Sequence, residues 1–217
     1  MTDVHDLTLD EVRVALADGI ASNAAFDGWG DEARDMAADA AGIDRDIARL
    51  AFKDGPVAMI DAWFGAIDAA MVAAVPREQA AAMKIRQRIT ALVEARLEAL
   101  SPNREALRRA LTILAMPQNA ASGARLGWRT VDTIWAQAGD TATDYNHYTK
   151  RMTLGAVYGS TLIAWIDDGS EAWIETADFL DRRIDNVMQF EKWKAQWRGS
   201  EHLSLSRFLG RLRYPPR

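Results

Sequence analysis

Residues 31–56 read DEARDMAADAAGIDRDIARLAFKDGP, and this stretch predicts two short helices joined by a tight turn. Gly42 ends the first helix, because glycine readily adopts the left-handed conformation that closes many helices. The second helix covers residues 44–52, and the proline of Asp54-Gly55-Pro56 suits the first turn of a longer helix. The order at this end of the chain is therefore a helix, two short helices and a long helix.

Helical patterns continue to the C-terminus, and no segment shows a convincing strand pattern. Thr8 and Glu11 form a capping box before the first helix, and apolar residues recur at helical spacing over residues 85–100. Prolines and glycines separate the segments. We predict an all-α protein of about ten helices, at residues 8–24, 31–42, 44–52, 54–76, 85–100, 101–117, 119–138, 143–167, 170–198 and 201–212.

Composition limits the chemistry that the chain can perform. It contains no cysteine, which excludes disulfides, zinc–thiolate sites and cysteine nucleophiles. Residues 1–10 are polar and acidic and lack a secretory signal pattern, so we expect a cytoplasmic protein. The fifteen uncharged residues 152–166 are fewer than the roughly 18 that a membrane-spanning helix needs, and they predict a buried helix.

The first four helices follow the order of a TetR-type helix-turn-helix domain, and the small residues of 37–43 resemble the turn of that family. Charge argues against DNA binding, because a DNA reader neutralises phosphates with Lys and Arg. The second short helix begins Asp44-Arg45-Asp46, and residues 27–54 carry eight acidic against four basic residues. We expect no nucleic-acid partner and a helix-turn-helix retained as a scaffold. The alternative is a ligand-responsive TetR-family transcriptional repressor.

The centre of the chain carries a more specific pattern. Residues 127–135 read GWRTVDTIW, residues 144–151 read DYNHYTKR, and residues 179–185 read FLDRRID. Together they resemble the ubiquinone-biosynthesis accessory protein family, whose members bind lipid and have a TetR-like fold. The resemblance covers about residues 26–188. One departure is His147, where the family usually has tryptophan.

The resemblance implies a non-catalytic homodimer that binds an isoprenoid lipid or ubiquinone precursor and presents it to the di-iron demethoxyubiquinone hydroxylase. The helices at 143–167 and 170–198 would form the dimer interface. The lipid would lie among the later helices, beside Trp128, Trp135, Met152, Tyr158 and Leu162. The hydroxylase would bind a surface made by Asp144, Asn146, His147, Tyr148 and Arg151.

The residues alone support a broader interpretation of the same segment. Trp128 and Trp135 lie two helical turns apart on one face, which is typical of core residues. Gly155 and Gly159 allow another helix to approach closely, and in a protein outside the membrane this more often indicates tight packing than a ligand channel. Carboxylates such as Asp144 are well placed to cap a helix.

The C-terminal end is basic and amphipathic. Residues 182–217 contain nine Lys or Arg against three acidic residues. An apolar face with flanking cations favours contact with anionic lipid at a membrane surface, although such a face can also dock on its own domain. The predicted membrane-contacting residues are Leu205, Arg207, Phe208, Leu209, Arg211 and Leu212.

Motifs of enzymes are missing from the sequence. The three histidines are isolated, no Glu-x-x-His pair suits a di-iron bundle, and no P-loop, G-x-S-x-G or G-x-G-x-x-G is present. We therefore expect no catalytic residue, metal or cofactor. The predicted organisation is a degenerate helix-turn-helix subdomain at 1–76, a helical lipid-binding and dimerisation domain at 77–199, and an amphipathic helix at 200–217.

Overall fold

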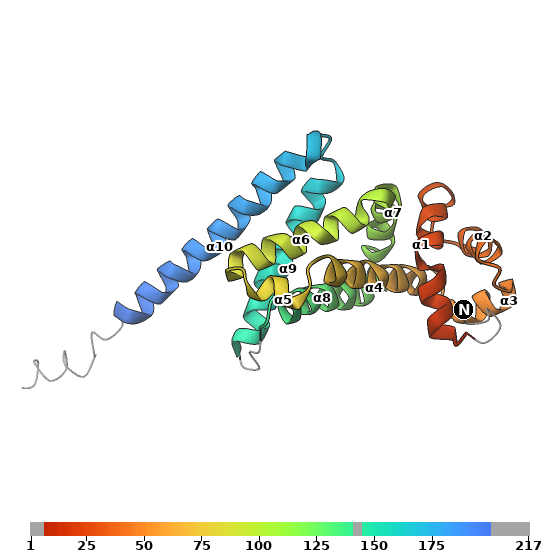
Figure 1. The fold of residues 1–217 in the computed structure, drawn as a ribbon, viewed down its shortest axis with the longest axis horizontal. Helices are drawn as coiled ribbons and strands as arrows, with labels where there is room; N and C mark the ends of the chain where they lie inside the picture. Colours follow the sequence, from red (N-terminus) through yellow and green to blue (C-terminus); the bar gives the residue numbers. More distant parts are fainter. Residues whose placement is uncertain (1–6, 141–144, 201–217) are drawn as a thin grey trace, which may run out of the picture.

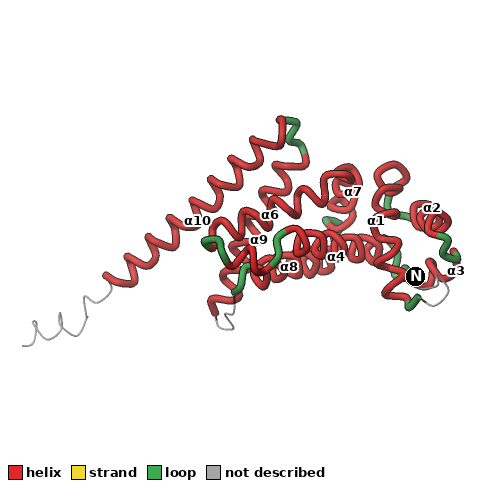
Figure 2. Tube along the Cα trace, viewed as in Figure 1, coloured by secondary structure: helices red, strands yellow, loops and turns green. Residues whose placement is uncertain are grey.

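The computed structural model describes residues 7–140 and 145–200, and every regular element in them is helical (Figure 2). The all-α prediction is confirmed. Short 3₁₀ turns at Ser101–Asn103 (η2), Pro117–Asn119 (η3) and Glu171–Trp173 (η4) precede three of the helices. The α-helices are α1 (Leu9–Asp27), α2 (Asp31–Ala41), α3 (Arg45–Ala51), α4 (Pro56–Ala74), α5 (Arg77–Ala81), α6 (Ile85–Leu100), α7 (Arg104–Leu114), α8 (Ala120–Gln137), α9 (Tyr145–Ile166) and α10 (Ile174–Ser200).

Capping residues read from the sequence lie at the helix ends that they predicted. Thr8 and Glu11 form the predicted capping box. Gly42 closes α2 with φ 69°, and the Asp44 carboxylate accepts the Asp46 N–H at 2.7 Å where α3 begins. The short helix α5 was not predicted, because five residues are too few to show a helical period. The predicted helix at 201–212 lies outside the described residues.

The helices form an elongated body with a small bundle at one end (Figure 1). Helices α1–α3 make this bundle, while α4, α6 and α8 run along the body. Helices α9 and α10 form an antiparallel pair at the opposite end, and α10 continues beyond the body. The bundle is attached through α1, which packs on α4 and α7, and through Trp29, whose Nε1 donates to the Ala106 carbonyl at 2.9 Å.

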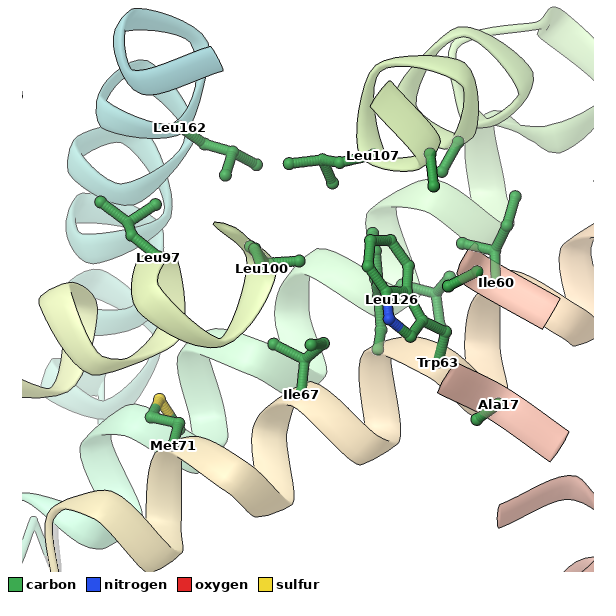
Figure 3. Packing of buried hydrophobic residues seen from close by; sticks show 14 of the residues in the cluster. Ala17, Ile60, Trp63, Ile67, Met71, Leu97, Leu100, Leu107, Leu126 and Leu162 are labelled. Atoms are coloured by element: carbon green, nitrogen blue, oxygen red, sulfur yellow. The ribbon is translucent and has the colours of Figure 1, made fainter. Parts of the chain in front are cut away.

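One hydrophobic cluster runs through the bundle and the body. Figure 3 shows Trp63 and Ile67 of α4 among leucines of α6, α7 and α8. By length and composition α4 would suffice to span a membrane. It packs instead against α1, α6, α7 and α8, so its apolar character follows from having neighbours on several sides. The predicted boundary at residue 76 falls in the turn between α4 and α5, and it stays a prediction.

A charged pair lies inside this core. Arg96 of α6 donates from Nε to Asp68 of α4 at 2.9 Å and from Nη2 to Thr130 of α8 at 3.2 Å, and its Nη1 donates to the Tyr158 hydroxyl of α9. The side chains of Arg96 and Asp68 are 1% and 8% exposed. Burial raises the pKa of Tyr158, so the phenol remains protonated. One guanidinium therefore connects four helices.

We expect the Arg96→Met variant to lose about 3–5 kcal/mol of unfolding free energy, because Asp68 would remain buried without its directly hydrogen-bonded counter-charge, with only the Arg129 Nε at 3.7 Å. Urea denaturation followed by circular dichroism measures this loss. The double variant Arg96→Met with Asp68→Leu should recover much of it, since no buried charge remains. Asp39→Ala, which breaks an exposed ion pair with Arg45, should change stability far less. Equal losses from Arg96→Met and Asp39→Ala would contradict this account.

Candidate functional site

An apolar cavity of about 250 Å³ opens between α6, α8, α9 and α10. Most of its wall is aliphatic, with one indole, from Trp135. Two hydroxyls, from Thr149 and Thr153, and two cations, Arg86 and Lys150, complete it. The lining residues are Ile85, Arg86 and Ile89 of α6, Trp135 of α8, Thr149, Lys150, Thr153, Leu154 and Val157 of α9, and Ile184, Val187 and Met188 of α10.

Both cations of the cavity are held by carboxylates. Arg86 pairs with Asp185 and, at 3.4 Å, with Asp181, which ties α6 to α10. Lys150 donates to Asp140 at 2.7 Å, and its Nζ lies 5.5 Å from the centroid of the Trp135 ring. These ion pairs hold the Arg86 guanidinium and the Lys150 ammonium in place in the wall of an otherwise apolar cavity.

Trp135 also holds the first turns of α9 against α8 by a hydrogen bond. Its Nε1 donates to the Lys150 carbonyl at 3.2 Å. The next residue, Arg151, donates to Asp132 of α8 at 2.6 Å and to Asp140 at 3.3 Å. Arg151 was predicted to face a partner, but it is only 4% exposed. It therefore braces α9 against α8, on the inner side of the helix.

An exposed aromatic patch lies on the outer side of the same turns. The rings of Trp128 and Tyr148 are 6.0 Å apart, and those of His147 and Tyr148 are 5.2 Å apart. Tyr148 is 59% exposed and Met152, one turn later, is 69% exposed. We call Trp128, His147, Tyr148 and Met152 the aromatic patch. Asp144 and the side chain of Asn146, which were predicted for the same surface, lie outside the part of the chain that the structure describes.

The structure distributes the predicted pocket residues over three environments. Only Trp135 lines the cavity. Trp128, predicted to be a core residue, is 38% exposed, and Met152 shares its patch. Tyr158 and Leu162 are buried in the core, where Tyr158 meets Arg96. Sequence analysis missed the lining from α6 and α10, although the helical spacing of Ile85 and Ile89 marked an apolar face there.

Gly155 and Gly159 do not provide a tight helix crossing. A Cβ added at Gly155 would meet only Val131, at 3.9 Å, and one added at Gly159 would meet nothing within 4 Å. Gly159 instead belongs to an outward stripe of small or apolar residues. The stripe consists of Tyr148, Met152, Ala156, Gly159 and Ile163.

In the α1–α3 bundle, ion pairs hold the arginines of the helix-turn-helix. Arg45 pairs with Asp39, which raises the pKa of Arg45 further above its ordinary value. Arg49 pairs with Asp35 at 2.9 Å and with Asp46 at 2.8 Å. Each guanidinium is thereby partly neutralised by a carboxylate, which weakens its attraction for a phosphate. In the part of the chain that the structure describes, no three His, Cys, Asp or Glu side chains are grouped to hold a metal ion.

Comparison with known proteins places this site in a family context. A family model described as COQ9 matches residues 120–191, which span α8, α9 and part of α10. The predicted family resemblance is confirmed. The cavity wall from α8, α9 and α10 and all four members of the aromatic patch fall within the COQ9-matching segment.

The curated relatives carry the same name. The rat (Rattus norvegicus) ubiquinone biosynthesis protein COQ9, mitochondrial, is 40% identical over 110 residues, which is 51% of this chain and 35% of that protein. The Drosophila melanogaster protein of that name is 24% identical over 204 residues, or 92% of this chain and 62% of that protein. The matched segment spans about a third of the length of the mammalian relatives.

A solved structure supports the TetR-like fold. It is described as a TetR transcriptional regulator from Nitrosomonas europaea, and it superposes with a TM-score of 0.66 at 24% identity. The match covers 82% of this chain and 98% of that one. At this identity the likeness concerns the fold alone.

We expect the purified chain to produce no salt-dependent mobility shift of chromosomal DNA fragments, because the arginines of α3 are bound to carboxylates. A true DNA reader with several phosphate contacts loses about 10³-fold or more in affinity between about 50 and 200 mM salt. The assay should compare those two salt concentrations. A shift present at low salt and abolished at high salt would favour the repressor alternative.

Proposed function

We propose that this protein is a non-catalytic, lipid-binding accessory protein of ubiquinone biosynthesis. The observation that carries the proposal is the apolar cavity between α6, α8, α9 and α10, most of which lies in the segment that matches the COQ9 family model. Apolar cavities with a few fixed polar groups are typical of ligand sites. A ligand-responsive repressor could also contain such a cavity, but the helix that would read DNA begins with Asp44 and Asp46, and its arginines are paired with carboxylates.

The cavity volume limits which part of a lipid it can hold. At about 250 Å³ it is smaller than the roughly 300–1,000 Å³ typical of pockets that enclose a whole drug-sized molecule. A long isoprenoid chain therefore cannot be enclosed. We infer that the cavity holds one end of the lipid, with a polar group of the lipid beside the Thr153 hydroxyl in the cavity wall. The remaining chain would extend out of the opening.

Three surfaces complete the proposed function. The aromatic patch would bind the di-iron demethoxyubiquinone hydroxylase, because exposed Tyr and Trp side chains are frequent binding hot spots. The rest of the outward stripe, Ala156, Gly159 and Ile163, would pair through α9 and α10 with a second copy of the chain and form a homodimer. The residues 205–212, outside the description, would bring the protein to a membrane surface. They follow α10, which contributes Ile184, Val187 and Met188 to the cavity.

We expect protein purified without detergent to release a stoichiometric isoprenoid or other lipid into an organic extract, as measured by mass spectrometry. The Val157→Phe variant should carry several-fold less lipid, because the larger side chain fills part of the cavity. Val14→Phe is the matched control, since Val14 is exposed on α1.

Circular dichroism should show that both variants remain folded. If wild-type protein carries no lipid even after incubation with quinone precursors, the cavity is not a lipid site. Equal lipid in Val157→Phe and wild type would place the lipid elsewhere.

We expect Tyr148→Ala to weaken binding to the hydroxylase by about 2 kcal/mol, roughly thirtyfold in Kd, because Tyr148 is the most exposed ring of the aromatic patch. Titration calorimetry with the purified hydroxylase measures the change. Leu50→Ala, at an exposed position of α3, should leave the affinity unchanged. An unchanged Kd for Tyr148→Ala would exclude the patch as the hydroxylase site.

A further inference from the structure

The four walls of the apolar cavity are not held together equally. Three of them, α6, α8 and α9, are joined by bonds from buried guanidinium groups. Arg151 of α9 donates to Asp132 of α8 at 2.6 Å. Arg96 of α6 donates to Thr130 of α8 and to Tyr158 of α9. Because separating these helices would leave buried charges without partners, the three walls form a fixed frame.

The fourth wall, α10, is held most firmly at its base. Asp168, just before η4, accepts hydrogen bonds from the backbone N–H and the hydroxyl of Thr176, at 2.9 and 2.5 Å. Leu180, one turn further along α10, is fully covered by its neighbours. Beyond Leu180 the cavity lies between α10 and α6, and Ile184 and Met188 line it. Side-chain packing between α10 and the first turns of α6 is therefore interrupted by the cavity itself.

One guanidinium bridges α6 and α10 beside this gap. Arg86 pairs with Asp185 and, at 3.4 Å, with Asp181. Between residues 85–100 of α6 and residues 174–189 of α10, the structure shows no further hydrogen bond or ion pair. The side chains of Arg86, Asp181 and Asp185 are 38%, 60% and 49% exposed. Water and salt therefore screen their attraction, and such a bridge is easily broken.

The mouth of the cavity lies at the same place. We call the boundary between residues 85–89 of α6 and residues 181–188 of α10 the α6–α10 seam. Two of the apolar residues that line the cavity are exposed, and they lie on opposite sides of this seam: Ile85 is 45% and Met188 is 41% exposed. Ile85 is next to Arg86 in the sequence, and Met188 follows Asp185 by three residues. An apolar rim and an exposed ion pair thus occur together at the seam.

We propose that the α6–α10 seam is the entrance of the cavity and that the ion pairs of Arg86 with Asp181 and Asp185 are the latch that keeps it closed. The apolar end of a long-chain lipid enters when α10 tilts away from α6 about its base. The part of the chain outside the cavity then lies between Ile85 and Met188. This inference rests on the proposed function, because it describes how the lipid of that function reaches its site.

The test uses a single engineered thiol, since the chain contains no cysteine of its own. In Val157→Cys the thiol lies in the cavity wall, at a position that is 7% exposed, and N-ethylmaleimide reaches it when the cavity opens. Adding Asp181→Asn and Asp185→Asn should raise the labelling rate about fivefold, because the seam loses its exposed ion pairs. Val12→Cys, 1% exposed in α1, is the matched control and should label at one slow rate with or without the asparagines.

Ionic strength tests the same ion pairs without changing them. Raising the salt concentration from about 50 to about 500 mM should speed the labelling of Val157→Cys several-fold, because salt screens exposed charges. The same change should have no effect once Asp181 and Asp185 are asparagine. Equal labelling rates with and without the asparagines would overturn the proposal. A salt dependence that persists in the asparagine variant, or an equal rise in Val12→Cys, would also overturn it, because the opening would then not depend on the latch.

Lipid transfer separates this inference from the proposed function. Transfer of bound lipid to phosphatidylcholine vesicles should be about fivefold faster for the double asparagine variant, with the lipid content before transfer unchanged. If labelling responds as expected but the protein carries no lipid, the latch is supported and the proposed function fails. If the protein carries lipid but neither labelling nor transfer depends on Asp181 and Asp185, the proposed function stands and the latch is wrong.

Discussion

The buried guanidinium of Arg96 constrains the arrangement of the whole body. A charge that is 1% exposed is tolerated only where its donors are satisfied, and here the partners come from α4, α8 and α9. Sliding or rotating any of these helices would separate the guanidinium from a partner. The orientation of α9 is therefore fixed from within the core, and with it the direction of every side chain that α9 presents to its surroundings.

Because the hydrogen bond from Arg96 to Tyr158 fixes the rotation of α9, its side chains fall into three groups with different surroundings. Its inner face carries Tyr158 and Trp165 in the core. A second face, with Thr153 and Val157, forms a wall of the apolar cavity between α6, α8, α9 and α10. The outward face carries Tyr148, Met152 and Ile163, which are exposed apolar residues of the kind that marks an interaction surface when they are contiguous. In the proposed function, this one helix contributes to the lipid cavity and to both protein-binding surfaces.

Structural features that depend on residues close together in the chain were predictable from the sequence. The capping box at Thr8, the left-handed Gly42 and the Asp44 cap are local, and the motif at 127–151 was specific enough to indicate the family. Long-range contacts were not predictable from periodicity. Trp128 and Trp135 share a helix face and both contact α9, yet Trp135 lines the cavity while Trp128 stays exposed beside Tyr148. Periodicity gives the direction of a side chain but not whether a neighbour lies there.

The buried ion pair could have been predicted from the sequence, because each partner is a lone charge in an apolar pattern. Asp68 interrupts the apolar pattern of α4, and Arg96 stands among the leucines of α6. A lone charge on an apolar face usually has a buried partner of opposite sign. Arg151 differs, because it follows the polar run Tyr148-Thr149-Lys150, which suggests exposure. Its burial follows from its ion pairs with Asp132, in α8, and Asp140, three residues after the end of α8.

The helix-turn-helix illustrates how a fold is retained while the chemistry of its surface changes. The close approach of α1 and α2 still requires a small residue, since a Cβ at Gly19 would lie 3.2 Å from the Ala37 Cβ. Packing therefore keeps the helices in the TetR-like arrangement. The outer face of α2 and α3 is under no such constraint, and there Asp35, Asp39 and Asp46 bind the arginines that a DNA reader would direct to phosphates. A shared fold thus gives no support to a shared function here, and function has to be argued from the cavity and surfaces of α9.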